Sequence, residues 1–213
     1  MAMNGHKITI VSCGPGSPDY LTLAARRAIE DAEVLVGAKR LLDQLAADDR
    51  ERILVGTDIE GVLNEMSKRR GKRIAVLVTG DAGLCSLARP VIKRFGREAC
   101  EVIPGISSVQ AAFARIGVEW YDAQILDAHG KDPEINPASL KGTKKIAVLA
   151  GRPESLRWTA DLADALGAGH EIFVCEDLTL DNERVRQVSP ADLRMLETSS
   201  RTIVLLIEKD LLE

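Results

Sequence analysis

The sequence predicts an α/β protein with two domains. Apolar, strand-like runs alternate with helical patterns through the first half of the chain, and the pattern changes near Gly117–Tyr121. Because the strands of the first half are continuously apolar, they predict a mostly parallel sheet with helices on both faces. We therefore predict a first domain over residues 1–117, a mixed α/β second domain over residues 118–213, and a ligand cleft between them.

The first half of the chain repeats a strand–helix pattern. Strands are expected over residues 8–12, 34–36, 53–55, 74–78 and 101–103, with helices over 22–32, 38–46, 61–70, 86–95 and 108–116. In the helix expected over 22–32, Leu23, Ala28 and Ile29 share one side, and Arg26 lies on the other. This amphipathic pattern indicates a helix that covers a buried sheet.

The second half has closely spaced strands and fewer expected helices. Strands are expected over residues 123–127, 146–150, 171–175, 184–188 and 202–208. Asp181 and Asn182 lie between two of these strands and predict an antiparallel hairpin. Ser189 followed by Pro190 is typical of a helix start.

Composition excludes several classes of function. Hydrophobic residues make up 46% and charged residues 28%, as in ordinary globular proteins, and the net charge of −4 argues against nucleic acid as a partner. No segment approaches the roughly 20 apolar residues of a membrane span, and no signal-peptide pattern precedes the first strand, so we expect a cytoplasmic protein that binds no membrane. The four cysteines form no C-x-x-C pair and are expected to be free thiols.

Four loops, each directly after an expected strand, combine glycine, proline and small polar residues. Ligands of open α/β sheets bind at the carboxyl ends of the strands, where such loops gather. Each loop alone is also explained by turn geometry. Together they favour a ligand site, and they are Gly14–Asp19, Thr79–Gly83, Pro104–Ser108 and Ala150–Pro153.

These loops match none of the common nucleotide or hydrolase motifs. In a G-x-G-x-x-G pattern that begins at Gly14, Asp19 takes the place of the third glycine, and Gly37 stands where an acid would hold a ribose. The P-loop pattern, the G-x-S-x-G pattern and metal-ligand spacings are also absent from the sequence. We therefore expect no NAD in its usual mode, no P-loop phosphoryl transfer and no metal.

Several polar residues at these positions leave two interpretations open. Asp81 either hydrogen-bonds a ligand or accepts backbone N–H groups of its own turn. Ser107 and Ser108 either contact a ligand or, in the case of Ser107, cap the following helix. His129 directly follows an expected strand, which makes it the best-placed histidine for proton exchange. Basic residues near loops or helix starts are ligand contacts or solvated surface groups: Lys39, Arg40, Arg89, Lys131, Arg152 and Arg157.

Taken together, the loops resemble the tetrapyrrole methylases, the two-domain methyltransferases of corrinoid and sirohaem synthesis. Residues 14–22, 79–86 and 103–112 carry the resemblance, which covers essentially the whole chain. Within the family, residues 36–42, 128–131 and 176–185 resemble the cobalt-precorrin-7 (C5)-methyltransferase branch. The chain departs from the family pattern at Ala82, where proline is frequent, and at Lys131, where arginine is expected.

This resemblance implies the tetrapyrrole methylase fold and S-adenosyl-L-methionine as methyl donor, with S-adenosyl-L-homocysteine as product. By position, it implies donor contacts at Pro15, Thr79, Gly80, Asp81, Ser107, Ser108, Ala150, Gly151 and Cys175. The first loop, with Gly14 and Gly16, would border the substrate, and Lys39, Arg40, Lys131 and Arg152 are candidates to pair with its carboxylates.

The implied reaction is methylation of C5 of cobalt-precorrin-7, an anionic tetrapyrrole, with His129 as candidate acid or base. The family also suggests a homodimer, and a separate decarboxylating C15-methyltransferase as functional partner. Two alternatives stay open. One is a related methyltransferase with another ring carbon, or a protein or RNA, as its target. The other is a non-catalytic metabolite-binding module.

Overall fold

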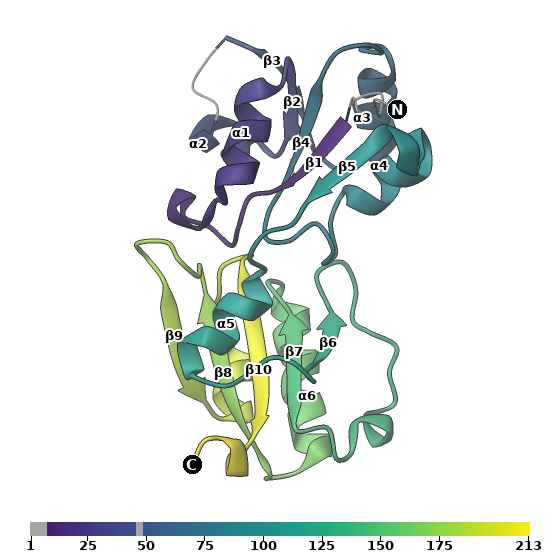
Figure 1. Cartoon of the computed structure of the whole chain (residues 1–213). Helices are drawn as coiled ribbons and strands as arrows, with labels where there is room; N and C mark the ends of the chain where they lie inside the picture. Colours follow the sequence, from purple (N-terminus) through teal and green to yellow (C-terminus); the bar gives the residue numbers. More distant parts are fainter. Residues whose placement is uncertain (1–7, 46–48) are drawn as a thin grey trace. The chain divides into compact units, whose positions relative to one another are not determined.

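The computed structural model describes residues 8–45 and 49–213, and the chain divides into two compact units, Met1–Ser107 and Ser108–Glu213 (Figure 1). The division falls earlier than the boundary expected at residues 117/118. Helix α5 (Ser108–Ile116) belongs to the second unit because it packs against strand β10 (Thr202–Glu208) of that unit. His6 lies outside the described residues.

The first unit contains a five-stranded parallel sheet, as predicted. Its strands lie in the order β3-β2-β4-β1-β5, and every neighbouring pair is parallel. All five expected strands are present, each within two residues of the expected bounds. They are β1 (Ile8–Ser12), β2 (Val34–Gly37), β3 (Glu51–Leu54), β4 (Ile74–Val78) and β5 (Cys100–Ile103).

Helices cover both faces of this sheet, which confirms the predicted layers. Side chains alternate along the strands, so Val11 and Leu77 pack with α1 and α2, whereas Ile10 and Val76 pack with α3 and α4 on the opposite face. The helices are α1 (Leu23–Asp31), α2 (Lys39–Leu45), α3 (Ile59–Ser67) and α4 (Ala88–Phe95). The helix expected over 38–46 is α2, and its last expected residue lies outside the described range.

Strand order places a topological switch point between β1 and β4. The chain moves from β1 through β2 to the edge strand β3, and then in the opposite direction through β4 to β5. Connections therefore leave the neighbouring strands β1 and β4 toward opposite sides and opposite faces. In open α/β sheets, ligands bind at the carboxyl ends of the strands at such a point.

The second unit contains a mixed five-stranded sheet in the order β6-β7-β10-β8-β9. Only β6 and β7 are parallel, and the remaining pairs are antiparallel, including the predicted hairpin of β8 and β9. β10 is the central strand, and its side chains from Ile203 to Ile207 are almost completely buried. The other strands are β6 (Gln124–Asp127), β7 (Lys145–Leu149), β8 (His170–Glu176) and β9 (Arg184–Val188).

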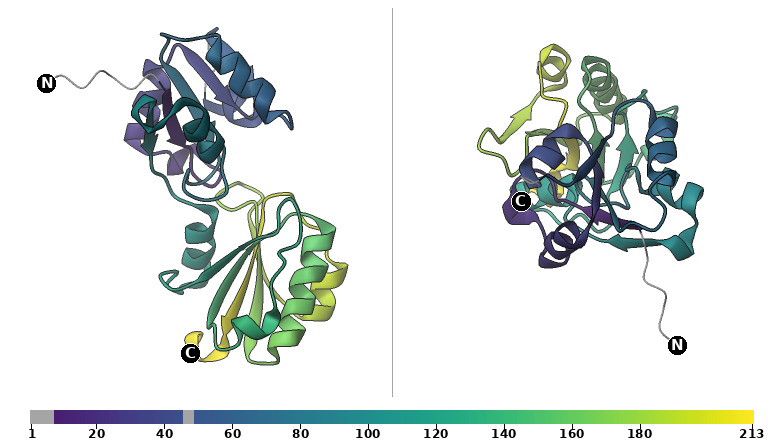
Figure 2. Two further views of the ribbon diagram at one scale, coloured as in Figure 1. Left: turned by 90° about the vertical axis from the view of Figure 1, so that its right-hand side faces the viewer. Right: turned by 90° about the horizontal axis from the view of Figure 1, so that it is seen from above.

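Two helices pack together on one face of this sheet, and α5 covers the other face (Figure 2). α7 (Pro190–Met195) begins as predicted, with Ser189 accepting a hydrogen bond from the Asp192 N–H. α6 (Pro153–Leu166), the longest helix among the described residues, was not expected. Its buried stripe includes Ser155, Thr159 and Ala160, so the apolar periodicity that identifies a helix in sequence is weak.

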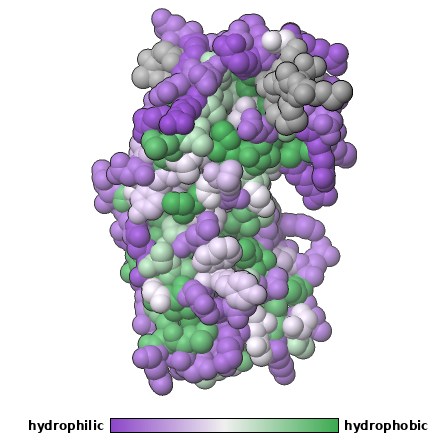
Figure 3. Space-filling view, viewed as in Figure 1, coloured by the Kyte–Doolittle hydropathy of each residue, from purple (hydrophilic) through white to green (hydrophobic). Residues whose placement is uncertain are grey.

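Polar side chains dominate the face shown in Figure 3, with smaller apolar patches between them. Exposed apolar residues such as Leu23, Leu54 and Met195 occur, as they do on most folded proteins. Within residues 8–45 and 49–213, no helix has the length and apolar character required to cross a membrane.

Candidate functional site

The loops after β1 and β4 meet through their backbones at the switch point of the first unit. The Gly14 N–H donates to the Gly80 carbonyl at 3.2 Å, and the Gly80 N–H donates to the Gly14 carbonyl at 2.7 Å. Both glycines have positive φ, 77° and 71°, which L side chains rarely adopt. The glycine requirement at residues 14 and 80 is therefore conformational, and it joins two of the sequence-predicted loops.

The loop after β5 joins the same group. Asp81 accepts hydrogen bonds from the Gly83 N–H and from the Gly105 N–H, both at 2.8 Å. The buried Ser12 hydroxyl, at the end of β1, accepts from the Ala82 N–H at 2.8 Å. Asp81 therefore accepts a backbone N–H group of its own turn, as one of its two interpretations expects. Its second oxygen also binds the Pro104–Ser108 loop.

The remaining first-unit candidates surround these three loops. Pro15 and Gly16 are buried, and Thr79 is exposed and receives a hydrogen bond from the Arg40 guanidinium at 3.3 Å. Arg40 also bonds Gln44, whose amide reaches the Gly16 carbonyl. Lys39 is 78% exposed and pairs only with Asp43 in the described contacts. The structure thus assembles Gly14, Pro15, Gly16, Arg40, Thr79, Gly80, Asp81 and the Gly105 loop in one region.

In the second unit, one edge of the sheet collects the other candidates. β6 and β7 end at this edge, and antiparallel pairing places the start of β10 and the end of β8 there as well. Ala150 is buried, and its N–H donates to the Thr202 carbonyl at 2.9 Å. Gly151 has φ of 118°, and an added Cβ would lie 2.4 Å from the Ser200 carbonyl oxygen. Only glycine permits this close approach of the two loops.

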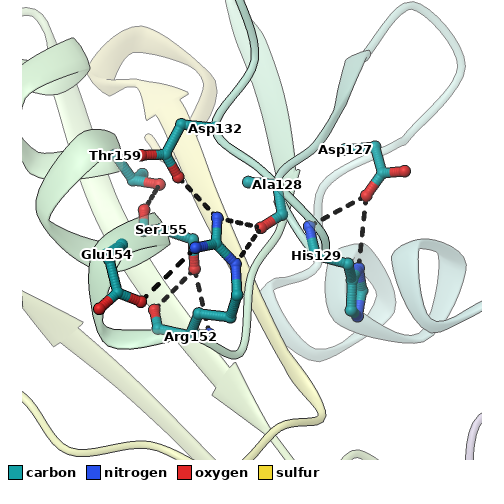
Figure 4. Close-up of polar contacts among 8 residues, drawn as sticks. All are labelled: Asp127, Ala128, His129, Asp132, Arg152, Glu154, Ser155 and Thr159. Carbon is teal, nitrogen blue, oxygen red and sulfur yellow. Dashed lines mark hydrogen bonds and ion pairs between the residues drawn. The ribbon is translucent and has the colours of Figure 1, made fainter. Parts of the chain in front are cut away.

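Arg152 and His129 lie on neighbouring loops at this edge (Figure 4). The Arg152 guanidinium donates to the Ala128 carbonyl and to Asp132. His129 is about half exposed; its N–H donates to Asp127 at 3.0 Å, and its Nδ1 lies 3.6 Å from the same carboxylate oxygen. Lys131 is 81% exposed and pairs with Glu134.

The connection between β8 and β9 is held in a strained conformation. Asp177 and Thr179 have positive φ, 48° and 69°, and such a φ is unusual for a β-branched threonine. Asp177 accepts from Arg201, Ser199 and Asn182 at 2.7–3.0 Å. Burial raises the pKa of Asp177, but these hydrogen bonds outweigh it, so the net pKa is lowered. An anionic Asp177 therefore fixes this loop.

Glu183 fixes the other end of the same loop. It forms a bidentate pair with Arg115 of α5 and accepts from the Thr179 N–H. The hydrogen bond from Arg115 lowers the pKa of Glu183, against a smaller opposing effect of burial. Cys175, a predicted donor contact, is completely buried, and burial raises the pKa of its thiol to about 12. Cys175 is therefore a neutral packing group in this structure, and its predicted ligand contact stays a prediction.

Sequence reasoning missed some of the polar residues that shape these loops. Ser12 carries a detectable signal, because it is a small polar residue at the end of a buried strand next to a glycine loop. Arg115 and Glu183 carry none, because they are 68 positions apart and meet only through the fold. Among the described residues, no cluster of three or more His, Cys, Asp or Glu side chains is arranged to hold a metal ion.

Residues 7–194 match the family of tetrapyrrole (corrin/porphyrin) methylases. The chain belongs to this family. It is 32% identical over 203 residues to the cobalt-precorrin-7 C(5)-methyltransferase of Salmonella typhimurium, which covers 95% of this chain and 100% of the relative. The resemblance inferred from the loops is thereby confirmed, and the chain is a methyltransferase of this family.

Solved structures of other tetrapyrrole methylases share the fold. The precorrin-6Y methylase of cobalamin biosynthesis from Archaeoglobus fulgidus aligns with a TM-score of 0.75 at 28% identity, over 96% of this chain and 100% of that one. The uroporphyrin-III C-methyltransferase of Thermus thermophilus, complexed with S-adenosylhomocysteine, aligns with a TM-score of 0.75 at 20% identity, over 94% and 92% of the two chains. The predicted fold class is confirmed.

Gly105→Ala tests the close packing of the three first-unit loops in this methylase. The added Cβ would lie 2.6 Å from the Ser12 Cβ, on a buried strand that cannot yield, so we expect a loss of about 1–3 kcal/mol in the free energy of unfolding. Urea unfolding followed by circular dichroism measures the change. Gly56→Ala is the matched control, because an added Cβ there has no atom within 4 Å. Equal stability of the two variants would contradict the packing argument.

Arg115→Gln tests the ion pair that fixes the β8–β9 loop. The folded-state pKa of Glu183 lies below its ordinary value of 4.5, so the pair stabilises the protein above that pH. This stabilisation is lost as the pH falls through the lowered value. We expect Arg115→Gln to destabilise the second unit by about 1 kcal/mol at neutral pH, and by less in acid. Unfolding followed by the fluorescence of Trp120 and Trp158, both in this unit, measures the difference.

Glu183→Gln provides the control for this prediction. In that background Arg115→Gln has no carboxylate to unpair, so it should add little at any pH. A destabilisation by Arg115→Gln that is constant from neutral to acidic pH would assign Arg115 a role other than pairing with Glu183.

Proposed function

We propose that this protein is an S-adenosyl-L-methionine-dependent C-methyltransferase of corrin biosynthesis that methylates C5 of cobalt-precorrin-7. The observation that carries the proposal is the 32% identity with the Salmonella enzyme over that enzyme's whole length. The fold of the precorrin-6Y methylase from Archaeoglobus fulgidus agrees with it. The segments around His129 and Glu176–Val185, which the structure places at one sheet edge, are those that resemble this branch.

The residues at the first-unit switch point fit a donor without phosphate. Gly14, Gly80 and Gly105 let three loop backbones approach closely, because no side chain lies between them. The Arg40 guanidinium, which lies beside these loops, donates hydrogen bonds to Thr79 and Gln44. The predicted donor contacts in this unit are Pro15, Thr79, Gly80, Asp81 and Ser107.

The second unit supplies the other predicted donor contacts, Ser108, Ala150, Gly151 and Cys175. We propose a donor that supplies an electrophilic methyl group on a positively charged sulfur. A carboxylate beside that sulfur would stabilise the ground state more than the transition state, in which the charge is dispersed. The arrangement of Asp81 agrees with this requirement, since its oxygens are directed to backbone N–H groups of Gly83 and Gly105.

The contribution of this chain to catalysis is then mainly positioning. Holding donor and acceptor carbon in line can supply about 7–11 kcal/mol, and no protein nucleophile is needed. Burial raises the pKa of the Cys13 thiol to about 12, so Cys13 is not a nucleophile at neutral pH. Lys39, Arg40, Lys131 and Arg152 are the predicted partners of the substrate carboxylates, and Gly14 and Gly16 are predicted to border the substrate.

A methyl-transfer assay tests the proposal. The protein is incubated with methyl-labelled S-adenosylmethionine and, separately, cobalt-precorrin-7, cobalt-precorrin-4 and uroporphyrinogen III. We expect label to enter cobalt-precorrin-7 alone, at C5 by NMR. Preferred labelling of another tetrapyrrole would keep the family activity and overturn the choice of substrate.

Thermal shift separates the enzyme from a non-catalytic metabolite-binding module of another kind. S-adenosylhomocysteine at about 100 times its Kd should stabilise the fold by about 2.7 kcal/mol, and Tm should rise, whereas NAD and ATP should leave it unchanged. A flat response to S-adenosylhomocysteine would overturn the donor assignment.

His129 is proposed as the acid or base that exchanges a proton with the macrocycle. The side chain is half exposed at the sheet edge and lies beside Asp127, which can orient its ring. We expect His129→Ala to lower kcat by about 100-fold or more while S-adenosylhomocysteine binds as before. Asp127→Asn, which keeps the size of the orienting group, should produce a smaller decrease. Turnover of His129→Ala within about twofold of the parent from about pH 6 to about pH 8 would exclude this role.

Three finer expectations from the sequence remain predictions: a homodimer, a cytoplasmic location, and a separate decarboxylating C15-methyltransferase that acts on the same macrocycle. Each has its own measurement. Sedimentation tests the first, cell fractionation the second, and a coupled assay with the second methyltransferase tests the third.

A further inference from the structure

We propose that Arg152 is a positioning residue that fixes the His129–Lys131 segment, and does not itself pair with a substrate carboxylate. The inference rests on the proposed function, because it concerns how substrate is recognised at that site. It replaces the role that the sequence suggested for Arg152. Its basis is the set of acceptors already bonded to the guanidinium (Figure 4).

The guanidinium bridges two points of the loop after β6. Its Nε and Nη2 donate to the Ala128 carbonyl at 3.2 and 3.1 Å, and Nη2 also donates to Asp132 at 2.7 Å. Ala128 and Asp132 directly flank the His129–Lys131 segment. A planar fork of N–H groups can hold two such acceptors at a fixed separation, which one ammonium group cannot do. Arg152 therefore closes the loop around His129.

The backbone of Arg152 is itself anchored in the core. Its N–H donates to the Ser155 hydroxyl at 3.2 Å, and that hydroxyl donates to the Arg152 carbonyl at 2.7 Å. Ser155 is completely buried, and Thr159 bonds its carbonyl at 2.6 Å. The guanidinium is thus carried by the rigid start of α6, and it transmits that rigidity to an otherwise exposed loop.

The charges around the Arg152 guanidinium support the same positioning role. The Arg152 side chain is 29% exposed and faces Asp132 and, at 3.5 Å, Glu154. Nε and Nη2 are already bonded to the Ala128 carbonyl and Asp132, and a substrate carboxylate would also meet the negative charge of Asp132 and Glu154. Hydrogen bonds between charged groups are among the stronger ones in proteins, so the bond to Asp132 favours the bridging position of the guanidinium. Lys131 and Lys39, by contrast, are 81% and 78% exposed.

Histidine NMR tests the positioning role without any ligand. The chain has three histidines, His6, His129 and His170, so single substitutions of these residues assign the imidazole signals. We expect Arg152→Ala and Asp132→Asn each to move the His129 signal. The His170 signal should stay in place, because His170 bonds the Thr143 carbonyl at the opposite end of the sheet. Arg194→Ala is the matched control, since it removes a guanidinium that pairs with Asp161 and Asp164 elsewhere on α6.

Kinetics with cobalt-precorrin-7 then separates positioning from direct contact. Asp132→Asn keeps the guanidinium and frees its charge, so a direct contact predicts an unchanged or lower KM for the substrate. The positioning role predicts the opposite, an increase of roughly tenfold for both Asp132→Asn and Arg152→Ala, with the KM of the donor unchanged. The double variant should have a substrate KM no higher than the single variants have, because each single substitution already breaks the same Arg152–Asp132 bridge.

Arg152→Lys keeps the test decisive where Arg152→Ala fails to fold. It retains the charge but not the fork, so we expect it to behave like Asp132→Asn in both measurements. Full rescue by Arg152→Lys would overturn the proposal, as would a raised KM with an unmoved His129 signal, or no change in either. Failure of the methyl-transfer assay alone would reject the substrate and leave the NMR result to decide the positioning role.

Discussion

The backbone pairing of Gly14 with Gly80 is the constraint on which the loops of the first unit depend. β1 and β4 are neighbours in a parallel sheet, so their carboxyl ends would diverge toward helices on opposite faces. Two reciprocal hydrogen bonds hold the loops together at that point, and they require positive φ at both residues. Asp81 and the Gly105 loop then pack onto a backbone arrangement that already exists.

The second unit reaches a comparable rigidity by another route. Side-chain networks fix the loops at the ends of its strands. Arg152 holds the loop after β6, Asp177 holds the start of the β8–β9 loop, and Glu183 holds its end. Each network places one charged group against several partners in the protein, so the loops are shaped before a ligand arrives. Preorganisation of this kind reduces the ordering entropy that binding would otherwise require.

The sequence predicts the strands and the loops far better than it predicts the contacts between them. Every strand of both sheets is predicted, and the buried strands carry a strong local apolar pattern. Helix α6 is not predicted, because its buried face contains Ser155, Thr159 and Ala160 among its apolar residues. The Gly14–Asp19 and Thr79–Gly83 loops are recognisable as a site, but the bond from Asp81 to Gly105 and the pair of Arg115 with Glu183 are long-range consequences of the fold.

The four cations predicted to bind substrate are therefore not equivalent. Lys39 and Lys131 form exposed ion pairs, which contribute at most about 1 kcal/mol and are readily exchanged for another carboxylate. Arg40 and Arg152 are bonded to groups that define the loops, Thr79 in one unit and the Ala128 carbonyl in the other. Removing them for ligand pairing would disturb the backbone that the ligand is to meet. We therefore propose that the lysines, whose flexible stems adapt to scattered carboxylates, are the better candidates for pairing with an anionic substrate, while the arginines keep the loops in shape.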